Sequence, residues 1–118
     1  INFMSPSSNY LRMYRKKSPL TQSDMGFLIG LKEISNISRY EKGQRHPTIE
    51  FLLNYHHIFE LSIETFYEPQ SELIKGHLTE RIQMLILEIK KSNNTLKNTP
   101  RIKFLEQIIS RLTNYINQ

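Results

Sequence analysis

Apolar residues recur every three or four positions along most of the chain. This spacing gathers them on one face of a helix, whereas no convincing stretch alternates as a half-buried strand does. In the first half, the spacing predicts five short helices, from about 8 or 9 to 17, then at 22–29, 33–41, 49–59 and 63–67. We therefore expect an all-α protein.

Capping residues and glycines mark the ends of these helices. Thr21, Thr48 and Ser62 each precede a periodic stretch, where a hydroxyl can accept a hydrogen bond from a free N–H of the first turn. Gly30 is expected to end the second helix in the left-handed conformation. Gly26 lies inside that helix, where we expect another helix to approach closely. The side chains expected in the core from the second and third helices are Met25, Leu28, Ile29, Ile34, Ile37 and Tyr40.

The second half is predicted to form two longer helices, at 72–91 and from Pro100 onward, with Pro69 as a boundary before them. A polar loop, 92–99, joins the two helices. Their apolar stripes include Leu78, Ile82, Leu85, Ile89, Ile102, Leu105, Ile109 and Leu112. Steps of three and four residues on both helices predict an antiparallel hairpin.

Two domains follow from this pattern, one at 8–68 and a hairpin at 71–118. The hairpin carries more apolar residues than two isolated helices can hide from water, so it must pack on something. A second copy of the hairpin would make a two-fold four-helix bundle and hence a homodimer. Folding back onto the first domain, as part of a monomeric core, is the alternative.

The net charge of +5 is unevenly distributed. Residues 1–59 carry eight Lys or Arg against four Asp or Glu, whereas residues 60–118 carry eight against seven. The positive surplus therefore lies in the first half, as binding of a polyanion such as a nucleic acid would require.

Several classes of function are disfavoured. The chain has no cysteine, and its four histidines are scattered apart from His56 and His57, whose side chains point about 100° apart on a helix. We therefore expect no metal site and no cofactor. No apolar run approaches the length of a membrane span, and neither C-terminal helix has a basic face opposite a strongly apolar one, so we expect no membrane partner. The absence of cysteine fits a reducing cytoplasm, so we expect a cytoplasmic protein. Without a glycine-rich phosphate loop or a nucleophile motif, we do not expect an enzyme.

Two helices joined by a tight turn, with the second carrying short polar residues opposite its buried stripe, make a helix-turn-helix. The sequence resembles the lambda-repressor/Cro-type (XRE-like) helix-turn-helix family of transcriptional regulators. The matching residues are Leu20-Thr21-Gln22, Ile29-Gly30-Leu31, Ile37-Ser38-Arg39-Tyr40-Glu41-Lys42-Gly43 and Pro47. The resemblance covers residues 10–67 and implies a five-helix domain. In one departure, Gly30 and Ile37 are seven positions apart, where the family most often has six.

The resemblance also implies roles for individual residues. The base-reading positions would be Lys32, Glu33, Ser35, Asn36, Ser38 and Arg39. The phosphate-binding positions would be Thr21, Gln22, Lys42, Gln44 and Arg45. Arg39 suits guanine and Asn36 suits adenine, because each can form a bidentate pair with that base in the major groove. Arg15 and Glu41 would form a structural ion pair between the first and third helices.

We therefore expect a sequence-specific regulator of transcription, a repressor that reads double-stranded DNA with helix 33–41 and dimerises through 71–118. The alternative is a protein-interaction module, such as an antitoxin or an antirepressor partner, that acts mainly through the hairpin. Weak, salt-insensitive association with DNA would favour the alternative.

Overall fold

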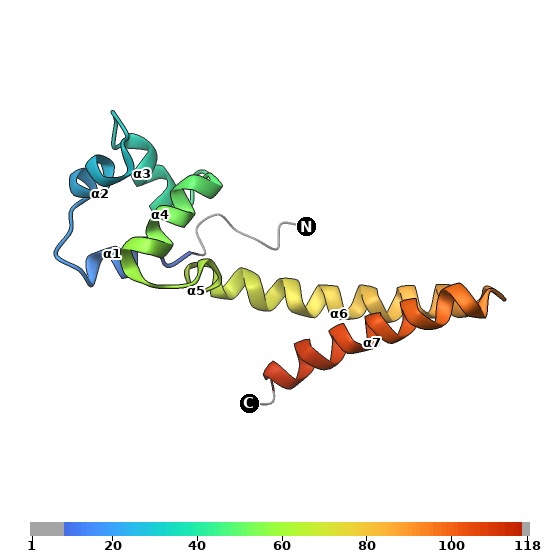
Figure 1. Cartoon of the computed structure of the whole chain (residues 1–118). Coiled ribbons are helices and arrows are strands. Elements are labelled where there is room, and N and C mark those ends of the chain that lie inside the picture. Colours follow the sequence, from blue (N-terminus) through green and yellow to red (C-terminus); the bar gives the residue numbers. More distant parts are fainter. Residues whose placement is uncertain (1–8, 117–118) are drawn as a thin grey trace. The chain divides into compact units, whose positions relative to one another are not determined.

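The structure is a computed structural model that describes residues 9–116, with side chains described through Thr113. Within this range the chain forms only helices and turns, which confirms the all-α class (Figure 1). Residue 8, one of the two predicted starts of the first helix, lies outside the described residues. The helices are α1 (Leu11–Lys16), α2 (Gln22–Ile29), α3 (Ser35–Glu41), α4 (Ile49–Phe59), α5 (Ile63–Phe66), α6 (Glu68–Lys90) and α7 (Thr95–Ile116).

The chain divides into two compact units, and the division falls between Ser71 and Glu72, within the first turns of α6. The first unit contains α1 to α5. The second contains α7 and the greater part of α6.

Aromatic and aliphatic side chains from all five short helices form the core of the first unit. The Phe51 and Tyr55 rings stack with centroids 4.5 Å apart, and the edge of Tyr40 meets Phe51 at 4.7 Å. The backbone N–H of Tyr10 donates to the Phe66 carbonyl at 2.8 Å, which ties the start of α1 to α5. The buried apolar members are Leu11, Met25, Ile37, Tyr40, Phe51, Tyr55 and Phe66.

The capping predictions for the first unit are confirmed. Thr21 accepts a hydrogen bond from the backbone N–H of Asp24, whose carboxylate accepts in return from the Thr21 N–H. Thr48 accepts from the Phe51 N–H at the start of α4, and Ser62 accepts from the Thr65 N–H at the start of α5. Gly30 ends α2 with a φ of 85°, in the left-handed region. Helices α2 and α4 also begin and end at the predicted residues.

The third helix starts later than predicted. It begins at Ser35, so Glu33 lies with Lys32 in the linker after Gly30 rather than on the helix. The additional residue between Gly30 and Ile37 lengthens this linker and delays the first helical turn.

Two residues predicted to be in the core are not. Ile34 is 42% exposed and Leu28 is 53% exposed. Ile34 precedes α3 and packs against Gly26 of α2. Its Cγ2 atom lies only 3.0 Å from the position that a Cβ atom on Gly26 would occupy. The buried residues of α2 are Met25 and Gly26, so Leu28 falls at the edge of the inward face. Gly26 has the predicted role, because it allows close packing of the segment that leads into α3.

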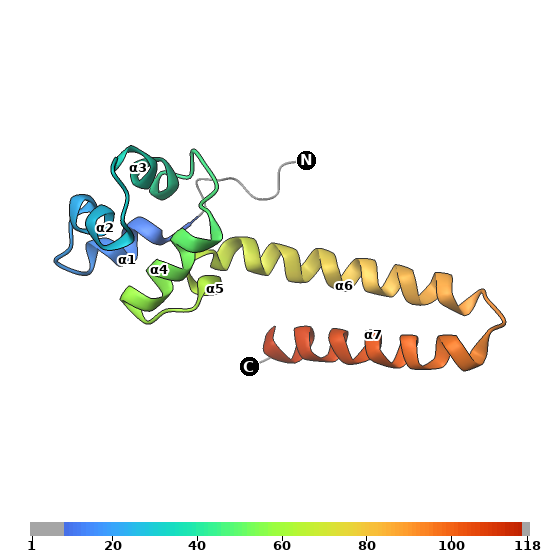
Figure 2. The ribbon, with the colours of Figure 1, turned by 45° about the horizontal axis from the view of Figure 1, so that its top comes forward.

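The second unit is an antiparallel hairpin, in which α6 and α7 run side by side in opposite directions (Figure 2). Both helices start earlier than predicted. Pro69 lies in the first turn of α6, where a missing N–H costs nothing. In the loop, the Asn94 side-chain oxygen accepts from the Lys97 N–H at 3.3 Å and caps α7, so Pro100 lies inside that helix rather than at its start.

The buried face of α6 is also rotated from the predicted stripe. Ile82, Ile86 and Ile89 are buried, whereas Leu78 and Leu85 are each 43% exposed. Ile86 therefore takes the buried position that was predicted for Leu85. The inward face of α7 includes one polar residue, the buried Asn98, whose side-chain N–H donates to the Ile89 carbonyl at 3.4 Å.

Candidate nucleic-acid interface

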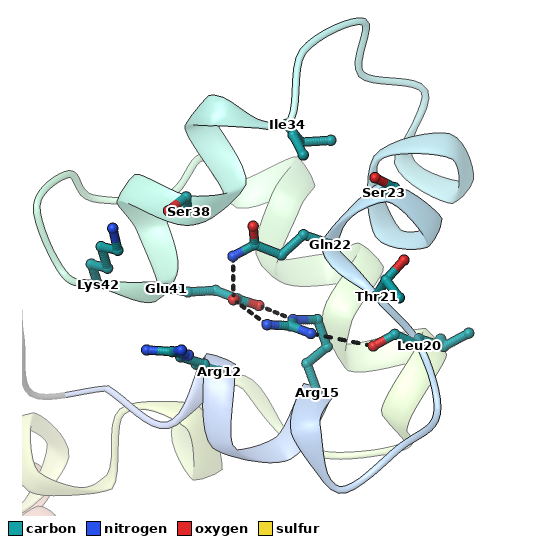
Figure 3. A pocket seen from close by; sticks show the side chains of 10 residues that line it. All are labelled: Arg12, Arg15, Leu20, Thr21, Gln22, Ser23, Ile34, Ser38, Glu41 and Lys42. Atoms are coloured by element: carbon teal, nitrogen blue, oxygen red, sulfur yellow. Dashed lines mark hydrogen bonds and ion pairs between the residues drawn. The ribbon is translucent and has the colours of Figure 1, made fainter.

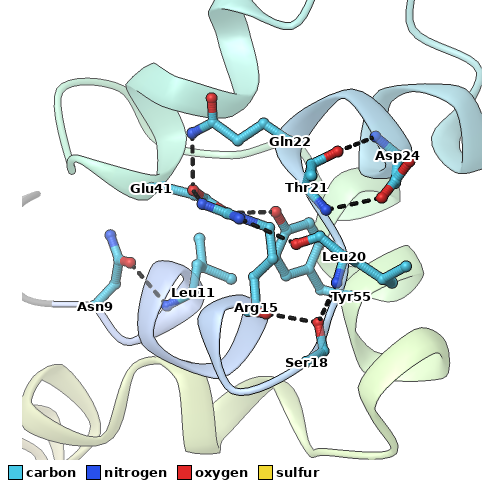
Figure 4. Close-up of polar contacts among 10 residues, drawn as sticks. All are labelled: Asn9, Leu11, Arg15, Ser18, Leu20, Thr21, Gln22, Asp24, Glu41 and Tyr55. Carbon is cyan, nitrogen blue, oxygen red and sulfur yellow. Dashed lines mark hydrogen bonds and ion pairs between the residues drawn. The ribbon is translucent and has the colours of Figure 1, made fainter.

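A buried ion pair joins α1 to the end of α3 (Figure 4). Arg15 Nε lies 2.7 Å from Glu41 Oε2, and Arg15 Nη2 lies 3.0 Å from Oε1. Arg15 Nη1 also donates to the Leu20 carbonyl at 3.2 Å, just before α2. This single guanidinium therefore fixes α1, the start of α2 and the end of α3 relative to one another.

Two further donors complete the environment of the Glu41 carboxylate. The Tyr55 hydroxyl donates to Oε2 at 2.8 Å, and the Gln22 side-chain amide donates to Oε1 at 3.0 Å. Gln22 was predicted to bind a phosphate, but one N–H of its side-chain amide is used here in the interior. Its backbone N–H, at the first position of α2, is not used by the capping interactions of Thr21 and Asp24.

These contacts shift the pKa values of the network. Burial tends to raise the pKa of Glu41, but hydrogen bonds from Arg15, Gln22 and Tyr55 outweigh it, so the pKa falls below its ordinary value. The hydrogen bond to Glu41 raises the pKa of Arg15. Burial, together with the Glu41 charge, raises the pKa of Tyr55. The pair therefore stays ionised and Tyr55 stays a neutral donor at physiological pH.

An open hollow of about 520 Å³ lies directly over this network, between α1, α2 and α3 (Figure 3). Its floor is the Arg15–Glu41 pair, and Arg12 and Lys42 contribute exposed cationic side chains from α1 and from the end of α3. The complete lining is Arg12, Arg15, Leu20, Thr21, Gln22, Ser23, Ile34, Ser38, Glu41 and Lys42. Cations, hydroxyls and the N-terminus of α2 together suit an anion.

Arg12 and Ser23 were not among the predicted site residues. A signal for Arg12 existed in the sequence: it precedes Arg15 by three positions, which places both side chains on the same face of a helix. Once Arg15 is assigned to a contact with the third helix, Arg12 must lie near that contact too. Ser23 follows Gln22 in the first turn of α2 and had no distinguishing pattern.

The outer face of α3 carries the polar residues predicted to read bases. Ser35 and Arg39, four residues apart, are exposed, while Ile37 and Tyr40 are buried against the core. The Arg39 side chain forms no hydrogen bond or ion pair within the described residues. Asn36 and Ser38 are half-buried at the two edges of this face. Helix α3 therefore presents an exposed arginine between small polar side chains.

The chain reverses direction sharply where α3 ends. Gly43 has a φ of 73°, its N–H donates to the Tyr40 carbonyl at 3.1 Å, and the N–H of Gln44 donates to the Arg39 carbonyl at 2.9 Å. This pair of bonds is the Schellman arrangement that ends many helices. It turns the exposed residues Gln44 and Arg45 back along α3.

As a result, Arg45 meets the start of the same helix. Its Nη1 donates to Asn36 Oδ1 at 3.1 Å, across nine positions of sequence. Two residues predicted separately, one for a phosphate and one for a base, are thus in direct contact. The linker residues Lys32 and Glu33 are exposed ahead of α3, outside this group.

Two other features are absent from the described residues. No three His, Cys, Asp or Glu side chains gather there closely enough to hold a metal ion. In the same range, no helix combines the length and the apolar character needed to cross a membrane.

Comparison with known proteins identifies the first unit. The family described as Helix-turn-helix matches residues 11–66, which run from the first residue of α1 to the last residue of α5. No curated protein and no solved structure matches the chain. Residues 11–66 therefore form a helix-turn-helix domain of the lambda-repressor/Cro type (XRE-like), the kind of domain that DNA-binding transcription regulators carry.

Proposed function

We propose that this protein is a repressor that binds a short operator sequence as a homodimer and reads it with α3. The observation that carries the proposal is Arg39, exposed on α3 with no partner among the described residues, while Ile37 and Tyr40 anchor the opposite face. An extended guanidinium can form two parallel hydrogen bonds with O6 and N7 of guanine in the major groove. Ser35 and Asn36 precede it on α3 and complete the reading face.

The hollow between α1, α2 and α3 supports a matching backbone contact. A DNA phosphate there would meet the N-terminus of α2, where Thr21 and Gln22 lie, and the side chains of Arg12 and Lys42. The Glu41 carboxylate beneath is neutralised by Arg15, so it would not repel the phosphate. Such contacts set the register of α3 in the groove and carry no sequence information.

The hairpin supports dimerisation. Its internal contacts leave a series of large apolar side chains exposed: Leu73, Ile74, Leu78, Met84, Leu85, Leu87, Leu96 and Phe104. One domain of this kind contacts few base pairs, so two copies on successive turns of the duplex are needed for specificity. A second copy of the hairpin, residues 71–118, is therefore the partner we propose for these side chains.

The DNA-binding part is tested by titrating the ¹⁵N-labelled chain with a mixed-sequence duplex at low salt. We expect chemical-shift changes at amides of α3 and of the first turn of α2, and little change along α7. Arg39→Ala should weaken binding, whereas Arg111→Ala, which removes an exposed arginine from α7, should not. Weak, salt-insensitive association without shift changes in α3 would contradict the proposal and favour a protein-interaction module that acts through the hairpin.

Dimerisation is tested by sedimentation velocity at micromolar concentrations. Leu78 and Leu85 lie two turns apart on one face of α6, so the double variant Leu78→Lys/Leu85→Lys should be monomeric. Gln83→Lys adds a cation on another face of the same helix and should leave the dimer intact. A wild-type protein that sediments as a monomer throughout would rule out the dimer.

A further inference from the structure

We propose that Arg45 is a positioning residue for base recognition: it holds the Asn36 amide in the orientation that adenine requires, and so affects one base preference as well as overall affinity. The inference rests on the proposed function, because it assigns a task within the same reading face. Without the contact between the two side chains, Arg45 would be an ordinary phosphate-binding cation in a loop.

The backbone fixes where Arg45 lies. Gly43, in its left-handed conformation, turns the chain back along α3. Only two residues separate Arg45 from Thr48, whose hydroxyl accepts from the Phe51 N–H at 3.1 Å and caps α4. The loop is therefore short and held at both ends, which limits the positions that the Arg45 guanidinium can reach.

The chemistry of the two groups then fixes the orientation of the Asn36 amide. A side-chain amide can rotate by half a turn and exchange its oxygen and nitrogen. An arginine has only donors, so the group that faces Arg45 Nη1 at 3.1 Å must be Oδ1. The nitrogen Nδ2, with two N–H donors, consequently points the other way. In the free protein, Arg45 selects one of the two amide orientations.

The selected orientation matches adenine. In the major groove, adenine presents N7 as an acceptor and the N6 amino group as a donor. Nδ2 of Asn36 can donate to N7, and Oδ1 has a second lone pair that can accept from N6 while the first stays with Arg45. Arg45 in turn has further N–H groups, and these remain available for a phosphate oxygen. One arginine would thus connect the DNA backbone to the base-reading amide.

The test compares base preferences rather than affinity alone. Operators recovered by selection from a random duplex pool are changed one base pair at a time, and binding is measured for the wild type, Asn36→Ala, Arg45→Ala and the double variant. We expect Asn36→Ala to lose about tenfold discrimination for adenine at one position. Arg45→Ala should lose most of that same discrimination, and the double variant should lose no more than Asn36→Ala does. An unchanged base profile in Arg45→Ala would overturn the inference.

Lys42→Ala is the matched control. It removes one exposed cation from the same end of α3 without touching Asn36, so it should weaken all sequences alike. In the free protein, NMR of the Asn36 side-chain amide should show faster motion in Arg45→Ala than in Lys42→Ala. Equal motion in both would overturn the inference whatever the DNA result. Failure of the wild type to select any sequence would instead overturn the proposed function.

Discussion

Arg15 and Glu41, twenty-six positions apart in sequence, form a bidentate ion pair, with two hydrogen bonds, inside the first unit. Their side chains are only 9% and 1% exposed. The pair links the helix that starts the domain to the last residue of α3, and Tyr55 and Gln22 donate to the same carboxylate. The position of the reading helix therefore depends on a polar contact as well as on the apolar core.

Replacing only one member of this ion pair should strongly destabilise the folded protein. Arg15→Ala leaves a buried carboxylate without its main partner, and we expect a loss of about 3–5 kcal/mol in the free energy of unfolding, measured by urea denaturation. The double variant Arg15→Met/Glu41→Leu removes both charges and should cost less than the single variant. If the two variants were equally destabilised, the loss would reflect packing rather than an unpaired charge.

Acid should destabilise the first unit through Glu41. Its pKa is lowered in the folded state, so the ionised carboxylate contributes stability that is fully present above the unfolded value of about 4.3. That contribution is lost as the pH falls from there through the folded pKa. Thermal denaturation across this range should show a falling melting temperature, with a flatter dependence for Glu41→Gln. Parallel curves for the two proteins would contradict this assignment.

A small stabilisation is available at the end of α4. Glu60 adopts a φ of 54°, a left-handed conformation that strains a residue with a side chain, and it places a negative charge at a helix C-terminus. Glu60→Gly should therefore raise the free energy of unfolding by about 0.5–1 kcal/mol. Glu60→Ala is the control, since it removes the charge but keeps the strain. The Glu60→Gly variant should be more stable than the Glu60→Ala variant. Equal free energies of unfolding for the two variants would argue against backbone strain at this position.

Much of the first unit could be predicted from sequence because its signals are local. The hydroxyl caps Thr21 and Thr48 correctly predict where α2 and α4 begin, and Gly30 correctly predicts where α2 ends. The start of α3 could not be placed in this way, because Ile34 extends the helical periodicity of Ile37 and Tyr40 although it precedes the helix. The seven-position step from Gly30 to Ile37 was the available sign of a longer turn.

The contacts within the site were harder to anticipate. The link between Arg45 and Asn36 depends on the left-handed turn at Gly43, and neither residue type indicates the other as a partner. In the hairpin, Asn94 was read as part of a polar loop although it caps α7. The favourable cap starts that helix before Pro100, which the helix then accommodates in its interior.

Arg39 should behave as a base-reading residue. Arg39→Ala is expected to cost about 1–3 kcal/mol of operator affinity and to relax one base preference, as measured by fluorescence anisotropy. Lys42→Ala should instead weaken operator and random duplex alike and reduce the slope of affinity against salt by about one unit. An Arg39→Ala protein that binds its operator normally would remove α3 from base recognition.

The most direct test of the account is selection of bound sequences from a random duplex pool at two salt concentrations. We expect a recovered palindrome whose half-sites are about 10 base pairs apart, since the two reading helices of a dimer enter successive major grooves on one face of the duplex. Steep salt dependence without an enriched sequence would contradict it, because the protein would then be a non-specific binder of the phosphate backbone.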